Sequence, residues 1–220
     1  MISSDLRMIA RSNLAGNWLK SALVAFIASL LGGALSGSNF SLSIDSDLLP
    51  YLPEALMYYF MIAATIGMLL GTLQFIIGGT VRLGYCVYLL KQHDGENPEL
   101  KDLFSQFHRF GDGFCLALLE GIYVFLWTLL FVIPGIIASL RYAMAPFIMV
   151  ESPYMTASEA INASKQLMEG NKARLFCLQW SFIGWILLCV LTLGIGNLFL
   201  NPYMEAATAA FYRKIQPKTN

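Results

Sequence analysis

The chain has 220 residues, of which 57% are hydrophobic and 13% are charged, and its 14 basic and 14 acidic residues leave no net charge. An ordinary soluble domain is roughly a quarter charged, so a soluble core of this size could not bury so much apolar surface. The basic residues are dispersed and form no cluster that would bind nucleic acid. Composition therefore predicts an integral membrane protein and excludes a nucleic-acid partner.

Six apolar stretches approach the length of roughly 20 helical residues that a bilayer core requires. The first follows a polar lead with three basic residues and also has features of a secretory signal peptide, but the long lead and the apolar remainder of the chain favour an uncleaved helix. The fourth and sixth stretches are shorter than a full crossing, and the second has an alternative end at residue 90. The predicted spans are 18–36, 56–83, 114–133, 136–150, 173–193 and 198–212.

With the exception of Arg141, lysine and arginine lie in alternate connections or at their edges, which indicates that these connections lie on the cytoplasmic side. They flank the first span, fill the connections after the second and fourth spans, and end the chain. The long loop 37–55 carries only acidic charges, and its role stays open. The pattern predicts an all-α, multi-pass protein of a bacterial inner membrane with about six spans in three hairpins and with both termini in the cytoplasm.

A polar amphipathic segment precedes each predicted hairpin and ends at a Gly-Asn or Gly-Asp pair, at residues 16–17, 111–112 and 170–171. This indicates either three repeat units, 1–96, 97–155 and 156–214, within one membrane domain 1–220, or a general need for glycine where a surface helix turns into the bilayer.

Each of the three segments carries its own helical signal. Leu6, Ile9, Ala10 and Leu14 share a face in the first, and Thr156 with Glu159 predicts a capping box in the third. The apolar face of the second predicts an interfacial helix, and its members are Leu100, Leu103, Phe104, Phe107 and Phe110.

Three charged residues fall inside predicted spans and away from the span ends, where charge is costly and marks a candidate site. They are Glu120, Arg141 and Glu205, and helix geometry lets them approach one level. One interpretation is an ion pair that fixes helix packing, and the other is a polar lining for a proton, an ion or a lipid head group. Small residues at Ala63, Gly67 and Gly71 predict close helix packing or self-association, and Pro134-Gly135 predicts a tight turn.

No catalytic or metal-binding motif is present in the sequence. The two histidines match no zinc spacing, the four cysteines form no paired motif, and no phosphate-binding loop or nucleophile turn occurs. We therefore expect no metal, no cofactor and no enzymatic activity.

Several motifs, mostly in the second half of the chain, resemble the bacterial integral membrane family called domain of unknown function 975. They are Phe131–Ile137, Arg141-Tyr142, Pro146–Glu151, Ser158–Ser164, Gly170–Lys172, Ser181–Trp185, Leu191–Gly196, Pro202-Tyr203 and Ala210–Tyr212. The resemblance implies a membrane location and a helical fold but supplies no activity.

Two functional hypotheses remain. The first is a non-catalytic membrane module that binds lipids, a membrane protein partner or a second copy of itself. The second is a small transporter or channel whose pathway includes Glu120, Arg141 and Glu205. A water-accessible cavity at these residues would favour the second hypothesis, and a sealed ion pair would favour the first.

Overall fold

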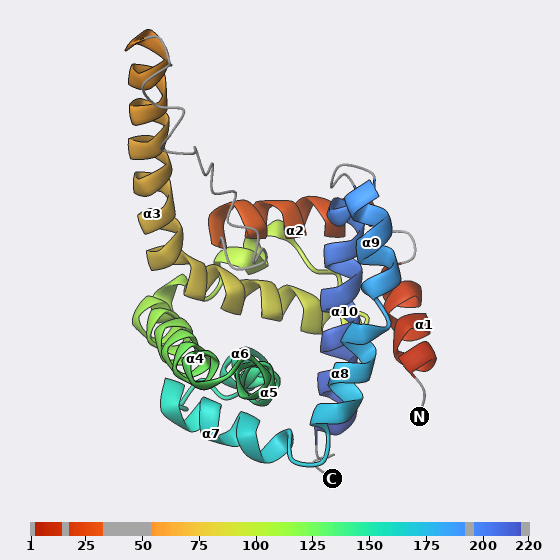
Figure 1. Ribbon diagram of the computed structural model, residues 1–220. Coiled ribbons are helices and arrows are strands. Elements are labelled where there is room, and N and C mark those ends of the chain that lie inside the picture. Colours follow the sequence, from red (N-terminus) through yellow and green to blue (C-terminus); the bar gives the residue numbers. More distant parts are fainter. Residues whose placement is uncertain (1–2, 15–17, 33–53, 192–195, 217–220) are drawn as a thin grey trace.

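The computed structural model describes residues 3–14, 18–32, 54–191 and 196–216, and all regular elements in these ranges are helices (Figure 1). The all-α prediction is thus confirmed for this part of the chain. The α-helices are α1 Ser3–Leu14, α2 Trp18–Gly32, α3 Glu54–His93, α4 Phe110–Leu130, α5 Val132–Tyr142, α6 Ala145–Glu151, α7 Ala157–Leu167, α8 Lys172–Trp180, α9 Ile183–Leu191 and α10 Asn197–Ile215, and the 3-10 helices are η2 Leu100–Phe104 and η3 Phe107–Arg109.

Four segments of the described chain are long and apolar enough to cross a membrane: Thr65–His93, Leu100–Leu130, Val132–Glu151 and Lys172–Cys189. They correspond to the second through fifth spans predicted from the sequence. The described part of the first predicted span is a helix of 15 residues, and α10 is long enough but much less apolar than α2. The number six and the arrangement in hairpins remain predictions.

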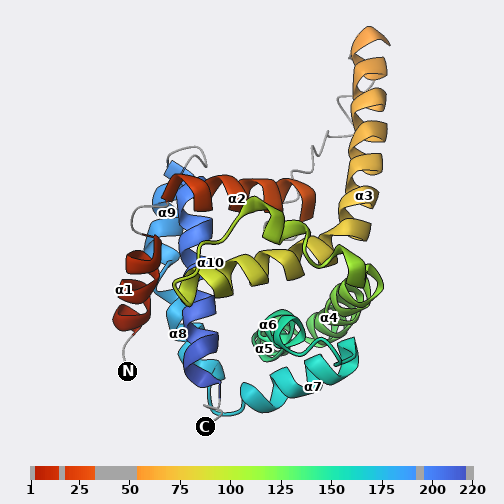
Figure 2. The same ribbon diagram turned by 180° about the vertical axis from the view of Figure 1, so that it is seen from behind.

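Helix α3 is far longer than the predicted span 56–83, because it contains 40 residues, which corresponds to about 60 Å of helix. Its first half is exposed and apolar, whereas its second half is buried; Leu69 is 70% exposed and Leu89 only 2%. Figures 1 and 2 show that the helix bends between these halves, so that only the second half runs among the other helices. Gly78-Gly79 lies where burial begins, and glycine pairs are common causes of such bends.

The turn after α4 comes three residues earlier than predicted. Phe131 is extended and separates α4 from α5, so Pro134 lies in the first turn of α5 rather than between helices. A proline is tolerated there because the first N–H groups of a helix have no intrahelical acceptor. Gly135 lies against α4, where an added Cβ would come within 2.2 Å of the Thr128 hydroxyl. The close contact of these two helices therefore requires glycine at that position.

The predicted interfacial helix at residues 100–110 is wrong as an α-helix, because two short 3-10 turns replace it. Local hydrogen bonds compete with a regular helix here: the Ser105 hydroxyl donates to the Asp102 carbonyl, and the Asp102 carboxylate accepts from the Glu99 N–H and from Lys91. On the predicted apolar face Leu103 is fully buried against α3. The other four members, Leu100, Phe104, Phe107 and Phe110, are 37–48% exposed.

The other two surface segments match their predictions more closely. In α1, Leu6, Ala10 and Leu14 are buried, and Ile9 packs beside them. The capping box of α7 is confirmed, since the side chains of Thr156 and Glu159 each accept from the other residue's backbone N–H.

The three predicted glycine junctions have different outcomes. Gly170 adopts a φ of +75° at the end of α7, as expected of a glycine that turns the chain. Gly111-Asp112 instead lies inside the first turn of α4, and Gly16-Asn17 is outside the described residues.

Candidate functional site

The candidate site begins with a contact between two glycines. A Cβ added to Gly79 of α3 would lie 2.2 Å from the carbonyl oxygen of Gly113 of α4, and one added to Gly113 would lie 3.0 Å from Thr80. A Cβ at Gly79 could not be accommodated without moving the helices apart, and one at Gly113 would make an unusually tight contact, so small residues permit the close approach here as they do in membrane helix pairs. Arg82 follows Gly79 by three residues and Glu120 follows Gly113 by seven, so each charge lies on the contacting face of its helix.

Arg82 and Glu120 form an ion pair at this crossing, with 2.7 Å between Nη1 and Oε2. The Glu120 side chain is 10% exposed and that of Arg82 is 39% exposed. The second oxygen of Glu120, Oε1, is buried and has no hydrogen-bond partner among the described residues. Glu120 is thus held inside the protein, whereas Arg82 is accessible, and its guanidinium retains donors for another group.

The predicted intramembrane residues are brought together only in part. Glu120 and Glu205 both act electrostatically on Arg82, so the two acids share one basic neighbour. Arg141 has no acidic partner in the described chain; its carbonyl accepts from the Ser164 hydroxyl, and its buried Nε has no hydrogen-bond partner there. The structure thus gives Glu120 a different partner from the predicted one.

Arg82 is the residue that the sequence interpretation missed. The sequence pattern places Arg82 with the basic residues of a cytoplasmic connection, because it lies at the end of the apolar run 56–83. The available signal was that the same run resumes after it and continues to residue 90, which places the charge inside the longer helix.

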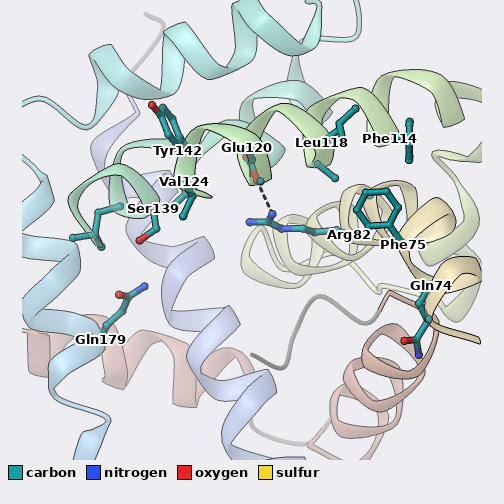
Figure 3. Close-up of a pocket in the computed structure, with 17 residues that line it drawn as sticks. Gln74, Phe75, Arg82, Phe114, Leu118, Glu120, Val124, Ser139, Tyr142 and Gln179 are labelled. Carbon is teal, nitrogen blue, oxygen red and sulfur yellow. Dashed lines mark hydrogen bonds and ion pairs between the residues drawn. The ribbon is translucent and has the colours of Figure 1, made fainter. Parts of the chain in front are cut away.

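A groove of about 680 Å³ opens beside the ion pair, between α3, α4, α5 and α8 (Figure 3). Its walls are mainly apolar, and they include Phe75, Phe114, Leu118, Val124 and Leu140. Gln74, Ser139 and Gln179 add polar groups around the opening, while Arg82 and Glu120 are its charged members. An apolar groove with a few convergent polar groups is the usual form of a binding site.

The polar groups of the groove are one ion pair, the side-chain amides of Gln74 and Gln179, and the hydroxyls of Ser139 and Tyr142. Its lining includes neither histidine nor cysteine, and its only acid, Glu120, is already held by Arg82. No group of three or more metal-ligating side chains occurs among the described residues, while the predicted lack of a metal or cofactor stays a prediction.

The predicted packing residues lie apart from this crossing. Gly67 and Gly71 are exposed on the first half of α3, and no atom of the described chain lies within 4 Å of a Cβ added to either. They form no close helix contact within this part of the chain, and the side chain of Ala63 is outside the described residues. Self-association through this stripe remains a prediction, and the close glycine contact occurs instead at Gly79 and Gly113.

A second polar cluster ties the end of α10 to α6 and α3. Glu151 accepts hydrogen bonds from Arg213, from the Tyr212 hydroxyl at 2.6 Å and from Gln216 at 2.6 Å, and Arg213 also pairs with Asp94. Burial opposes the charge on Arg213, but the hydrogen bond to Asp94 and the charges of both acids outweigh it and raise the pKa of Arg213. These contacts join the end of α10 to α6 and to the end of α3, so the cluster serves as a structural tie, although the buried Nε of Arg213 has no hydrogen-bond partner among the described residues.

The described helices expose large apolar side chains in long runs. Leu69, Phe75, Phe125 and Leu129 are each more than 60% exposed, as is Ile133 at the α4–α5 turn. A soluble monomer rarely exposes such continuous apolar surface, whereas a membrane protein presents it to lipid. Together with the four candidate spans, this surface is the kind that a helical membrane protein presents.

The family follows from comparison with known sequences. The family model described as protein of unknown function, DUF975, matches residues 1–137 and 128–219, and the chain belongs to this family. No curated protein and no solved structure matches the chain. The resemblance noted in the sequence is thus confirmed at the level of the family, and the family brings no activity with it.

Proposed function

We propose that this protein is a non-catalytic membrane module that binds a single membrane lipid in the groove beside Arg82 and Glu120. The observation that carries the proposal is the combination of apolar walls with one accessible guanidinium. Acyl chains would lie along the Phe75, Phe114 and Leu118 walls, and polar atoms of the head group would accept from Arg82. The volume of about 680 Å³ is that of an ordinary ligand site.

The alternative is a small transporter that uses the same polar site. It is favoured by one observation, the acidic excess created when Glu120 and Glu205 share the single charge of Arg82, which would suit a proton or a cation. Against it, Glu120 is held in a direct ion pair and Arg82 provides the accessible charge. We therefore place lipid binding first.

The membrane setting proposed here retains six spans, with both termini in the cytoplasm of a bacterial cell. Support comes from the alternation of basic and uncharged connections in the sequence. The exposed Phe104, Phe107 and Phe110 would lie at the cytoplasmic interface, where aromatic rings are favoured. A membrane protein partner or a second copy would bind on the exposed first half of α3.

A pair of glycine substitutions tests lipid binding at the groove. Gly121 lines the groove and Gly184 of α9 does not, yet a Cβ added at either position meets nothing within 4 Å. Gly121→Leu should therefore fill the groove without disturbing the fold, and Gly184→Leu is the matched control. Native mass spectrometry of protein released from nanodiscs should show one more retained lipid per chain in the wild type and in Gly184→Leu than in Gly121→Leu.

Two outcomes would count against lipid binding. One is a wild-type protein that retains no more lipid than Gly121→Leu does. The other is a proteoliposome assay in which the wild type carries a proton or cation flux that Gly121→Leu blocks, which would support the transporter instead.

A further inference from the structure

A second groove, separate from the first, lies where α1, α8 and α10 meet. Its volume is about 500 Å³, and its lining combines apolar side chains with two cations, Arg174 and Lys214. Figures 1 and 2 both show α1, α8 and α10 side by side at one end of the molecule, although they come from opposite ends of the chain. The lining includes no acidic residue.

The two cations have no acidic partner within the described residues. The ion pairs found there involve Arg82, Lys91, Lys101, Arg109 and Arg213, and neither cation of this groove is among them. Arg174 donates only a long hydrogen bond of 3.3 Å to the neutral side chain of Asn171. Both cations belong to exposed residues, so each can meet an external anion.

The first turn of α8 reinforces this positive field. Asn171, at the N-cap position, makes no side-chain capping bond, because its amide nitrogen donates back to the Leu167 carbonyl at 3.0 Å. The first N–H groups of a helix have no intrahelical acceptor, and the positive end of the helix dipole lies there. Asn171, Ala173 and Arg174 all line the groove, so this end of α8 faces the same space as Lys214.

The apolar part of the groove decides between a free anion and a lipid. Ala173 and Cys177 of α8 and Ile215 of α10 contribute accessible apolar surface directly beside the cations, while Leu6 and Phe211 in the same lining are buried. Inorganic phosphate would use the cations but leave this surface uncovered, whereas a phospholipid covers both. Residue 172 is also the end of a candidate span, where the phosphate groups of a bilayer lie.

We propose that this groove binds the head group of an anionic phospholipid, with the phosphate between Arg174 and Lys214 and the first acyl carbons against Ala173, Cys177 and Ile215. Basic pockets between helices at the cytoplasmic interface are suited to such head groups. The site is independent of the groove at Arg82, and it would anchor α1 and α10 to the charged face of the membrane.

The test measures binding of short-chain phosphatidylglycerol and phosphatidylcholine to the full chain in detergent by native mass spectrometry. The wild type should prefer phosphatidylglycerol, and Arg174→Gln with Lys214→Gln should weaken that binding roughly 30-fold, since each basic residue near a membrane surface contributes about a factor of five. The charge-matched control, Lys20→Gln with Lys101→Gln, removes two exposed cations outside the groove and should bind as the wild type does. Gly121→Leu should also retain phosphatidylglycerol here, which separates this proposal from the first.

A thiol measurement on the wild-type chain avoids any variant that fails to fold. Cys177 lines the groove and Cys115 of α4 does not, and both cysteines are exposed. Adding phosphatidylglycerol to phosphatidylcholine nanodiscs should slow maleimide modification of Cys177 severalfold and leave Cys115 unchanged.

The proposal is overturned if the wild type shows no preference for phosphatidylglycerol, if the Arg174 and Lys214 double variant binds as tightly as the control, or if Cys177 gains no protection. Full displacement of phosphatidylglycerol by millimolar inorganic phosphate would likewise overturn it, because a free anion would then be the ligand.

Discussion

Replacing Gly79 by alanine should destabilise the protein by bringing a methyl group into the backbone of α4. The added Cβ would lie 2.2 Å from the Gly113 carbonyl oxygen and 3.0 Å from the Ala117 side chain, so the helices must separate. Overpacking of this kind costs about 1–3 kcal/mol, against a gain in helix propensity of about 1 kcal/mol for removing a glycine. Because the two nearest obstructing atoms belong to the backbone of Gly113, we expect a cost in the upper part of this range and a net loss of up to about 2 kcal/mol.

Gly71→Ala provides the matched control in the same helix. Its Cβ meets nothing within 4 Å, so the propensity gain should appear alone, as no change or a small increase in stability. The free energy of unfolding would be measured for both variants by titration with a denaturing detergent, followed by helical circular dichroism. Equal stability of the two variants would refute the close approach of α3 and α4 and, with it, the geometry that brings Arg82 to Glu120.

Three further predictions concern the polar groups. Glu120→Ala should lose about 1–3 kcal/mol of unfolding free energy, whereas Arg82→Met combined with Glu120→Leu should recover most of it, and the same denaturation assay measures both. Hydrogen bonds from Thr156 lower the pKa of Glu159 below its usual 4.5. The stability that this cap contributes should therefore be complete above pH 4.5 and be lost as the pH falls through the lowered pKa. The loss would be measured as faster amide exchange in α7. Glu151→Ala removes an acceptor of three hydrogen bonds and should cost on the order of 3 kcal/mol, with increased proteolysis at the end of α10; no change would refute the structural tie.

The sequence predicts best those features whose partners are close along the chain. The Thr156–Glu159 capping box spans three residues, and the buried face of α1 repeats at helical spacing, so both could be predicted without the fold. The α-helix predicted around Leu103 does not form, although the same spacing rule applies to it. Its helical spacing is real, but a competing set of local hydrogen bonds and its close contact with Gly84 hold it in 3-10 turns.

The ion-pair partner of Glu120 depended on tertiary structure. Glu120 is recognisable as a charge inside an apolar run, but its partner is 38 residues away on a helix that bends. A basic residue near the end of an apolar run normally flanks a span, and only the full length of α3 places Arg82 within one. The small residues show the same limit: Gly67 belongs to a stripe of small residues and has no close contact, whereas Gly79 lies outside that stripe and packs against Gly113.

The exposure of Arg82 bears on whether its ion pair is only structural. A pair that merely fixes helix packing can be replaced by apolar side chains without loss, so its two members need no access to solvent or ligand. Here the acid is almost fully buried while the base is 39% exposed and faces a groove with apolar walls. The replacement of both members by Met and Leu therefore separates the two roles: a structural pair predicts a folded protein that retains its lipid, and a head-group site predicts a folded protein that has lost it.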